Sequence, residues 1–539
     1  MIEAQAAELH DAAWAAAQSG DMARAILLAG QAAAIWPHPD HLLTLGQFQL
    51  AAGRGADAVA TLRQAVALYP QVPAVQGTLA LALRQASDPA AWTEAVTRLE
   101  AAVALAPDDI TGQLNLALLR HHAAAADDEV TTEIRRAICL DGRDLDVWAD
   151  AAAMFHDRGR FAEARDATRQ ALCLDPAMTR SVHAHAEAVA VMAGAGVALR
   201  WFDRLVMLDP AMAVHRVARA KARLAAGDLR GGWDEYEVRR GLPIFGLPAA
   251  MPGDSNPQPL SDRTVLVYPE QGFGDIIQFV SFVPPLCRRA RHVFLVAHPD
   301  LKALFEEMPG GDGRLSVVDA AAASQLHADL AVPVMSLPRL LDMAPQGVPY
   351  LRPAPRQRER WSQALAGQPG LRVGVCWSGN PRRDAPLVMR MTDYRRSIPL
   401  ETFGPALAGI EDATFISLQH GYRAGDVPQE QGIRDASAYI RDFSDLAGLI
   451  ANLDLVITVD TAVAHLAGAL GARTWMLNRF DSCWRWGRGA TTTPWYDSMT
   501  IFNQATPMDW SVPLAEVRNS LRVLIADQAA AIAARKTLP

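Results

Sequence analysis

The chain has few cysteines and no long hydrophobic run, and both shortages limit its class. Its 539 residues include five widely spaced cysteines, which never form a Cys-x-x-Cys pair. This usage predicts reduced thiols and argues against a disulfide framework or a cysteine-rich metal site. No segment offers about 18 consecutive apolar residues, and the first residues carry acids and alanines where a signal peptide has a basic start and an apolar run. We therefore expect a cytoplasmic protein without a membrane span.

The chain also lacks an excess of basic charge. The formal net charge is −8 and the isoelectric point is about 6.0. This balance supplies no general basic surface for nucleic acid, so we expect no nucleic-acid partner. The histidines at 121–122 and at 183 and 185 lack further Cys or His partners, so we expect no metal and no cofactor. Because half of this long chain is hydrophobic, it should form two or three domains.

Residues 1–241 are rich in alanine and leucine and are punctuated at a regular interval. Motifs such as IWP, LYP and LDP end at residues 37, 70, 107, 142, 176 and 210, which are 33 to 37 residues apart. A glycine recurs within most units, at Gly20, Gly53, Gly159, Gly194 and Gly227. Such a glycine ends one helix, and the proline begins the next where no backbone donor is needed. The pattern resembles the tetratricopeptide repeat, whose unit is about 34 residues, and predicts an all-α solenoid.

A solenoid of this kind usually binds a protein on its concave face, and the alternative is a spacer or dimerisation arm. Asp144–Asp146 has the D-x-D spelling of some metal-dependent sugar transferases, but it lies at a repeat boundary, where helix-starting acids are expected. Residues 242–262 contain five prolines, which predicts a linker.

From residue 263 onward, strand-like and helix-like segments alternate. The alternation runs over 263–352 and restarts over 371–510, after a polar connection. This order predicts two doubly wound α/β domains with parallel sheets and a ligand cleft between them. A final helix is expected over 511–539.

A glycine turn with an acid follows the first predicted strand of this region. Gly272 and Gly274 allow close ligand approach, and Asp275 stands at the junction between strand and helix. The alternative interpretation is a tight turn with a capping aspartate.

A second junction lies at residues 453–478. A buried strand ends in Asp460, and Thr461 is expected to cap an alanine-rich helix that contains Ala462 and His465. The free amides and the positive dipole end of such a helix favour a phosphate. For His465 the alternative to a ligand contact is a hydrogen bond inside the domain interface.

Together, EQGFGDIIQF (270–279), CWSGNP (376–381), RRSIPLE (395–401), SLQHG (417–421) and DTAVAHLAGALG (460–471) resemble the heptosyltransferase-like glycosyltransferases. The whole chain is similar to bacterial flagellin glycosyltransferases that join such a domain to tetratricopeptide repeats. The resemblance implies a GT-B fold, with an acceptor side mainly in the first domain and a nucleotide-sugar side mainly in the second. It also implies metal-independent transfer with inversion, in which Asp275 matches the family's acid and is the candidate general base.

The resemblance also implies donor-binding residues in the second domain. These are Asp460, Thr461, Ala462 and His465 at the helix terminus, with Ser378, Asn380 and Gln419 at other strand ends. A cation for the departing phosphate is expected from Arg395 or Arg396, or from Arg382 or Arg383. Trp484, Trp486 and Trp495 either stack on a sugar or base or close the core between the domains.

We therefore predict a glycosyltransferase that moves a sugar from a nucleotide sugar to a protein acceptor recruited by the repeats, such as flagellin or another surface protein. The alternatives are a transferase for lipopolysaccharide or another glycan, and a non-catalytic repeat adaptor with a degenerate transferase domain. We also expect residues 1–240 and residues 258–539 to fold as separate halves.

Overall fold

The computed structural model describes residues 2–84, 89–122, 127–247, 259–309, 313–381, 387–420 and 432–536. Its internal contacts divide the chain into two compact units. One comprises Met1–Arg158 and Asp166–Pro176, and the other comprises Gly159–Arg165 and Ala177–Pro539. The last repeat helices therefore belong to the same unit as the α/β region, and the division falls within the repeats rather than at residues 242–262.

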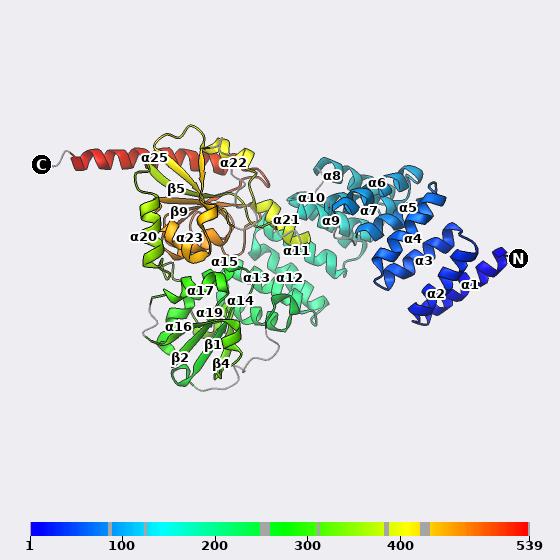
Figure 1. Cartoon of the computed structure of the whole chain (residues 1–539), viewed down its shortest axis with the longest axis horizontal. Helices are drawn as coiled ribbons and strands as arrows, with labels where there is room; N and C mark the ends of the chain where they lie inside the picture. The colour runs from blue at the N-terminus through cyan, green and yellow to red at the C-terminus, as the bar shows by residue number, and fades with distance from the viewer. Residues whose placement is uncertain are drawn as a thin grey trace. The chain divides into compact units, whose positions relative to one another are not determined.

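The repeat region is entirely helical where it is described, as expected (blue to green in Figure 1). Its helices are α1 (Ile2–Gln18), α2 (Met22–Ile35), α3 (Pro39–Ala51), α4 (Gly55–Leu68), α5 (Pro73–Arg84), α6 (Pro89–Leu105), α7 (Ile110–His122), α8 (Asp127–Leu140), α9 (Leu145–Asp157), α10 (Phe161–Leu174), α11 (Thr179–Ala193), α12 (Ala195–Leu208), α13 (Ala213–Ala225) and α14 (Leu229–Tyr236).

The recurring glycines of the repeats lie where the sequence predicts, but the motif prolines do not begin the helices that follow them. Pro70 and Pro107, for example, lie three residues before the first residues of α5 and α7. All five recurring glycines lie between helices with a left-handed φ, from 73° at Gly53 to 97° at Gly194. A side chain rarely adopts this conformation, so glycine is favoured there. Asp144 of the D-x-D spelling accepts hydrogen bonds from the backbone N–H groups of Asp146 and Val147. It is an N-cap of α9 and has a structural role.

The first α/β domain contains a four-stranded parallel sheet in the order β3-β2-β1-β4. The strands are β1 (Thr264–Tyr268), β2 (His292–Val296), β3 (Leu315–Val318) and β4 (Leu330–Pro333). Its helices are α15 (Phe273–Phe279), α16 (Val283–Arg289), α17 (Pro299–Glu306), α18 (Ala320–Ala323) and α19 (Leu337–Leu341).

The second α/β domain contains a six-stranded parallel sheet in the order β10-β9-β8-β5-β6-β7. The strands are β5 (Leu371–Cys376), β6 (Ala413–Ser417), β7 (Ile433–Asp435), β8 (Leu455–Val459), β9 (Thr474–Asn478) and β10 (Met499–Asn503). The helices are α20 (Pro355–Ala364), α21 (Leu387–Arg396), α22 (Leu400–Leu407), α23 (Phe443–Ile450), α24 (Ala462–Ala469) and α25 (Ser511–Lys536). Strand order reverses between β5 and β8, so the ligand crevice is expected at their carboxyl ends.

A helical solenoid followed by parallel-sheet α/β domains confirms the predicted fold class. One apolar core joins the end of the repeats to both α/β domains. Trp233 and Tyr236 of α14 belong to it, together with Phe279 of α15 and Tyr496 of the second domain. A second core holds α25 against the larger sheet through Leu514, among others.

The predicted linker 242–262 is described only in part, because residues 248–258 lie outside the described ranges. Its described parts hold short 3-10 turns at Pro243–Phe245 and Leu260–Asp262. Among the helices of the described ranges, none is long and apolar enough to cross a bilayer.

Candidate active site

Asp275 stands in the first turn of α15, where the glycine turn after β1 ends. Its Oδ2 accepts a hydrogen bond from the backbone N–H of Gly272 at 3.1 Å. Part of the carboxylate therefore caps the helix, as the alternative interpretation of this turn expected. The other oxygen, Oδ1, accepts from Nη2 of Arg485, and the side chain is 24% exposed. The Asp275 carboxylate is therefore fixed by Gly272 and Arg485, and part of it remains accessible to solvent.

Arg485 is the main residue of the site that sequence reasoning missed. Its Nε donates to Oε1 of Gln278 at 2.7 Å, and its guanidinium lies 4.4 Å from the ring centroid of Trp484. Burial lowers the pKa of Arg485, but the Asp275 carboxylate and Cys483 raise it more, so the net pKa lies above the usual range. The arginine between two tryptophans, in WRW, was the available signal, because such rings offer cation–π contacts.

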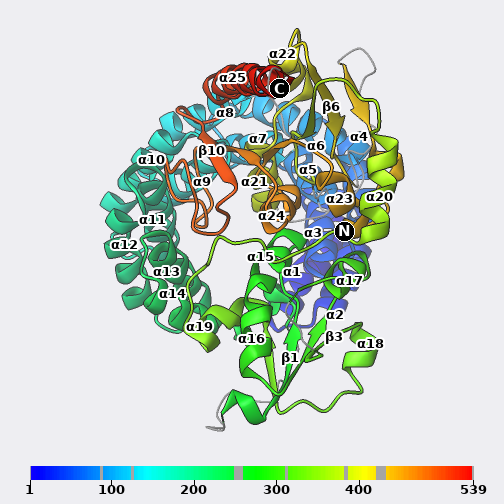
Figure 2. The same ribbon diagram turned by 90° about the vertical axis from the view of Figure 1, so that its left-hand side faces the viewer.

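Helices α15 and α24 lie directly against each other (Figure 2). A Cβ on Gly274 would lie 2.8 Å from Cδ2 of His465 and 3.6 Å from Cα of Ala462. The shorter distance is below real van der Waals contact, so this approach needs glycine. The N-termini of the two helices therefore meet, which brings Asp275 close to the first turn of α24.

His465 lies in the interface between the two α/β domains. It is 5% exposed, its Nδ1 is 2.9 Å from the hydroxyl of Tyr496, and its ring stacks on Trp486 with centroids 5.1 Å apart. Burial lowers the pKa of His465 to about 4, so the ring is neutral near pH 7. This geometry corresponds to the interface alternative, and a donor contact stays a prediction.

The carboxyl ends of β5, β6 and β8 bring together most of the predicted donor residues. The backbone N–H of Ser378 donates to Oε1 of Gln419 at 3.0 Å, and Gln419 Nε2 donates back to Ser378 Oγ at 3.2 Å. Thr461 is the N-cap of α24, but its side chain makes no capping hydrogen bond. Asp460 and Ala462 flank it and are partly exposed. The first backbone N–H groups of α24 therefore receive no hydrogen bond from the Thr461 side chain. The nearby side chains of Ser378 and Gln419 are buried and hydrogen-bonded to each other.

The arginine pair at 395 and 396 lies at the end of helix α21. Arg395 is buried and its Nε donates to Asp481 at 3.1 Å, while Arg396 donates to Asp393 at 2.9 Å. Helix α21 buries Met391, Asp393 and Arg395, so charged side chains form most of its inward face. Both guanidinium groups are thus engaged by carboxylates.

Of the other residues predicted to bind the donor, one lies after β5 and two lie outside the described residues. Asn380 is exposed just after β5, and Arg382 and Arg383 lie outside the described residues. Within the described ranges, no group of three or more His, Cys, Asp or Glu side chains is placed to hold a metal ion.

The segment after α14 is built into the loop that precedes Asp275. Arg239 is paired with Glu270, whose Oε1 also accepts from the backbone N–H of Met335 at 3.0 Å. The next residue, Gln271, has a left-handed φ of 63°, and its side-chain nitrogen donates to the hydroxyl of Tyr236 at 2.9 Å. A non-glycine residue in this conformation is strained, so the contact with Tyr236 helps to hold the turn.

The tryptophans of the 484–495 segment close the core between the domains. Trp486 and Trp495 are buried, and Trp495 lies 5.2 Å from the ring centroid of Phe279 in α15. Trp484 contacts Trp233 of the last repeat helix, with centroids 5.6 Å apart. These rings therefore pack the end of the repeats against both α/β domains.

Comparisons with known proteins agree with this architecture. A tetratricopeptide repeat family matches residues 16–82, and glycosyltransferase family 9 (heptosyltransferase) matches residues 441–508. Protein FlbA of Caulobacter vibrioides is 24% identical over 449 residues, which cover 77% of this chain and 73% of FlbA.

Part of the chain is also similar to solved structures. A tetratricopeptide repeat protein from Parabacteroides merdae is 14% identical, with a TM-score of 0.37, and the match covers 43% of this chain and 91% of that one. PilF from Pseudomonas aeruginosa is 16% identical, with a TM-score of 0.35, over 41% of this chain and 99% of PilF.

The family match at residues 441–508 contains β8, α24 and β9, and thus the helix terminus that faces Asp275. The chain is a glycosyltransferase, with tetratricopeptide repeats at its N-terminus and a glycosyltransferase family 9 (heptosyltransferase) domain at its C-terminus, as its sequence motifs predicted.

Proposed function

We propose that this glycosyltransferase moves a sugar from a nucleotide sugar to a hydroxyl group of a protein acceptor recruited by the repeats. The single observation that carries the proposal is the meeting of α15 and α24 at Gly274, which brings a carboxylate and a helix N-terminus together. Transfer needs both, because a proton is removed from the acceptor while negative charge develops on the leaving diphosphate.

In the proposed reaction, the acceptor oxygen attacks the anomeric carbon from the face opposite the diphosphate. The new bond forms as the bond from carbon to phosphate oxygen breaks, and the electron pair leaves with the diphosphate. Asp275 takes the proton from the acceptor, and configuration at the anomeric carbon inverts. Arg485 orients the carboxylate, with which it is paired.

The departing diphosphate is met by the amides that open α24. Thr461 makes no side-chain capping bond, which supports their availability, and the positive end of the helix dipole favours the anion. Asp460, Ala462, Ser378 and Gln419 complete the proposed donor site. No step in this proposal uses a metal, so EDTA is expected to leave transfer unchanged.

A protein acceptor, such as flagellin or another surface protein, is supported by the repeats. Helical repeats of this kind commonly bind proteins, and their last helix is joined to the loop before Asp275. Recruitment raises the effective concentration of the acceptor beside the carboxylate. For a lipopolysaccharide or other glycan acceptor, the repeats would instead serve the assembly of a complex.

The test compares intact masses of proteins that co-purify with the chain from cells with and without it. We expect one protein to carry a discrete sugar mass that is absent in the deletion strain and in cells with Asp275→Asn. Glu306→Gln, an exposed carboxylate in α17, serves as the matched control and should keep the modification. Unchanged protein masses in all strains would instead support an adaptor, and a change confined to extracted glycans would support a glycan transferase.

A further inference from the structure

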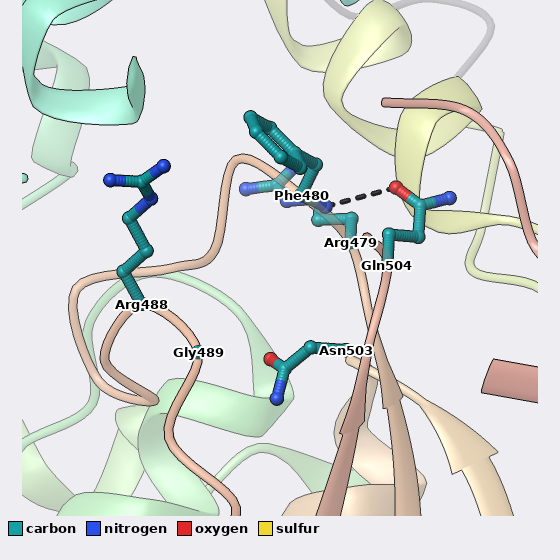
Figure 3. Close-up of a pocket in the computed structure, with 6 residues that line it drawn as sticks. All are labelled: Arg479, Phe480, Arg488, Gly489, Asn503 and Gln504. Carbon is teal, nitrogen blue, oxygen red and sulfur yellow. Dashed lines mark hydrogen bonds between the residues drawn. The ribbon is translucent and has the colours of Figure 1, made fainter. Parts of the chain in front are cut away.

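A pocket lies beside the proposed donor site, at the carboxyl ends of β9 and β10. It is lined by Arg479, Phe480, Arg488, Gly489, Asn503 and Gln504, and its volume is about 370 Å³. Figure 3 shows Arg488 and Gly489 across the pocket from Asn503 and Gln504. At about 30 Å³ for each water, this volume corresponds to roughly twelve waters, which leaves room for a diphosphate.

The lining of this pocket is cationic. Two of its six residues are arginines and none is acidic. Arg488 is exposed and its guanidinium lies 5.8 Å from the ring centroid of Phe480; among the described residues it forms no ion pair. The nearby Asp481 accepts from Arg395 at 3.1 Å and lies 3.6 Å from Nε of Arg479. Asp481 thus lies between Arg395 and Arg479, whereas Arg488 is outside this group of ion pairs.

Two buried donors at the pocket have no hydrogen-bond partner in the described part of the chain. They are Nε of Arg479 and Nε2 of Gln504. Gln504 is 5% exposed, and its Oε1 accepts from the backbone N–H of Phe480 at 2.9 Å (Figure 3). That contact fixes the amide orientation and leaves the N–H groups as the unsatisfied end. Figure 3 shows this amide nitrogen on the side of Gln504 away from Arg488 and Asn503, so Gln504 shapes the wall of the pocket and the arginines supply its donors.

The pocket adjoins the helix terminus proposed for the donor phosphates. Strand β9 pairs in parallel with β8, with Leu477 opposite Val459. Arg479 directly follows β9, as Asp460 and Thr461 follow β8, and Thr461 is the N-cap of α24. The pocket and that helix terminus therefore lie at the same carboxyl edge of the sheet, where a cation after one strand can act on an anion at the end of its neighbour.

We propose that the Arg479–Arg488 pocket binds a diphosphate group, and that its two guanidinium groups stabilise the leaving charge during transfer. The assignment to the donor rests on the proposed function. It also names another source of the cation than Arg395 and Arg396, because Arg488 forms no ion pair among the described residues, whereas Arg395 and Arg396 donate to Asp481 and Asp393. Guanidinium groups suit this role, since their paired N–H donors match phosphate oxygens.

The test is calorimetric titration of the full chain with inorganic pyrophosphate. We expect Arg488→Gln to weaken binding roughly tenfold, as loss of one charge-assisted hydrogen bond does. Arg473→Gln is the matched control, because this arginine is exposed at the opposite end of β9 and should leave binding unchanged. Arg479→Gln should show the same loss, but Arg479 also donates to the carbonyl of Thr392, so the exposed Arg488 is the decisive position.

Three outcomes would overturn the proposal. They are no pyrophosphate binding to the unmodified chain, equal binding by the chain and its Arg488→Gln variant, and equal or tighter binding of glutarate, which would indicate a carboxylate site. Failure of the proposed function looks different. In that case pyrophosphate binding still depends on Arg488, but no nucleoside diphosphate among UDP, GDP, ADP and CDP competes for it.

Discussion

Arg239 donates two hydrogen bonds to Glu270, from Nε to Oε2 at 2.9 Å and from Nη2 to Oε1 at 2.7 Å. Neither side chain has any exposed surface. Arg239 follows the last repeat helix, and Glu270 begins the loop that leads to Asp275. The end of the repeats is therefore part of the structure that holds the proposed base, and not a separate module tethered by a linker.

Breaking this buried pair should destabilise the second unit strongly. Glu270→Gln removes the fully buried counterion of Arg239 and leaves only the partly exposed Glu237, at 3.0 Å, to balance the charge, and such losses typically cost about 3–5 kcal/mol. Urea denaturation followed by tryptophan fluorescence measures the change. The matched control is Asp234→Asn, which breaks an exposed pair with Arg339 and should cost less than about 1 kcal/mol. If both substitutions lower the free energy of unfolding equally, the buried pair contributes no more to stability than the exposed one.

The position of a truncation should decide whether the transferase folds. A fragment of residues 159–539 keeps all of the second unit and is expected to be folded. A fragment of residues 258–539, which the sequence suggested as a separate half, lacks Trp233, Tyr236 and Arg239. It should be insoluble or melt at a clearly lower temperature, because it exposes the core face of Phe279 and leaves Glu270 unpaired. Superimposable thermal melts of the two fragments would refute this prediction.

Gly274→Ala should damage both stability and transfer. The new methyl group would lie 2.8 Å from Cδ2 of His465, so α15 and α24 must separate, at a cost of about 1–3 kcal/mol. Gly77→Ala in helix α5 is the control, because no atom lies within 4 Å of its added Cβ. That change should be neutral or stabilise by up to about 1 kcal/mol. Thermal denaturation and transfer rates measured together check both, and an unaffected Gly274→Ala variant would contradict the close approach.

Arg485→Lys should lower kcat more than it raises the KM for the acceptor. Lysine keeps the charge but loses the fork that contacts Asp275 and Gln278 together. Loss of a charge-assisted hydrogen bond in a buried site is expected to reduce kcat by roughly 10- to 100-fold. Arg288→Lys, an exposed residue of α16, is the control. A change confined to KM would show that Arg485 binds substrate and does not orient the carboxylate.

Stability should fall in acid because of His465. Its pKa is about 4 in the folded chain, against an ordinary value of 6.5, since burial disfavours the charged ring. The unfolded state therefore binds more protons between these values, and the contribution of His465, complete above pH 6.5, is lost as the pH falls toward 4. The loss amounts to about 3 kcal/mol.

Urea denaturation at several pH values checks this expectation. His465→Gln removes the titrating ring and should flatten the dependence between pH 6.5 and 4, although it also loses the stack on Trp486 and is less stable overall. If the variant shows the same slope as the unmodified chain, another group is responsible for the acid sensitivity.

The architecture could be predicted from the sequence because its signals are local and periodic. The glycine at each repeat turn has a left-handed φ that other residues rarely adopt, so Gly53 and Gly194 mark helix ends without any tertiary information. The alternation of buried strands and helices in the second half likewise follows from short-range patterns. The motif around Asp275 was readable for the same reason, since a strand, a glycine turn and a helix-starting acid are consecutive.

Contacts between residues far apart in the chain could not be read in this way. Arg485 lies 210 residues from the carboxylate it contacts, and Arg239 lies 31 residues from Glu270. The two neighbouring tryptophans were the only local signal at Arg485, and the sequence motifs favoured Arg395 and Arg396, which donate to aspartates in the structure. Local sequence alone determined the helices, strands and turns. Only tertiary packing decided which charges pair and which remain open to an anion, because that depends on which strand ends and helix termini meet.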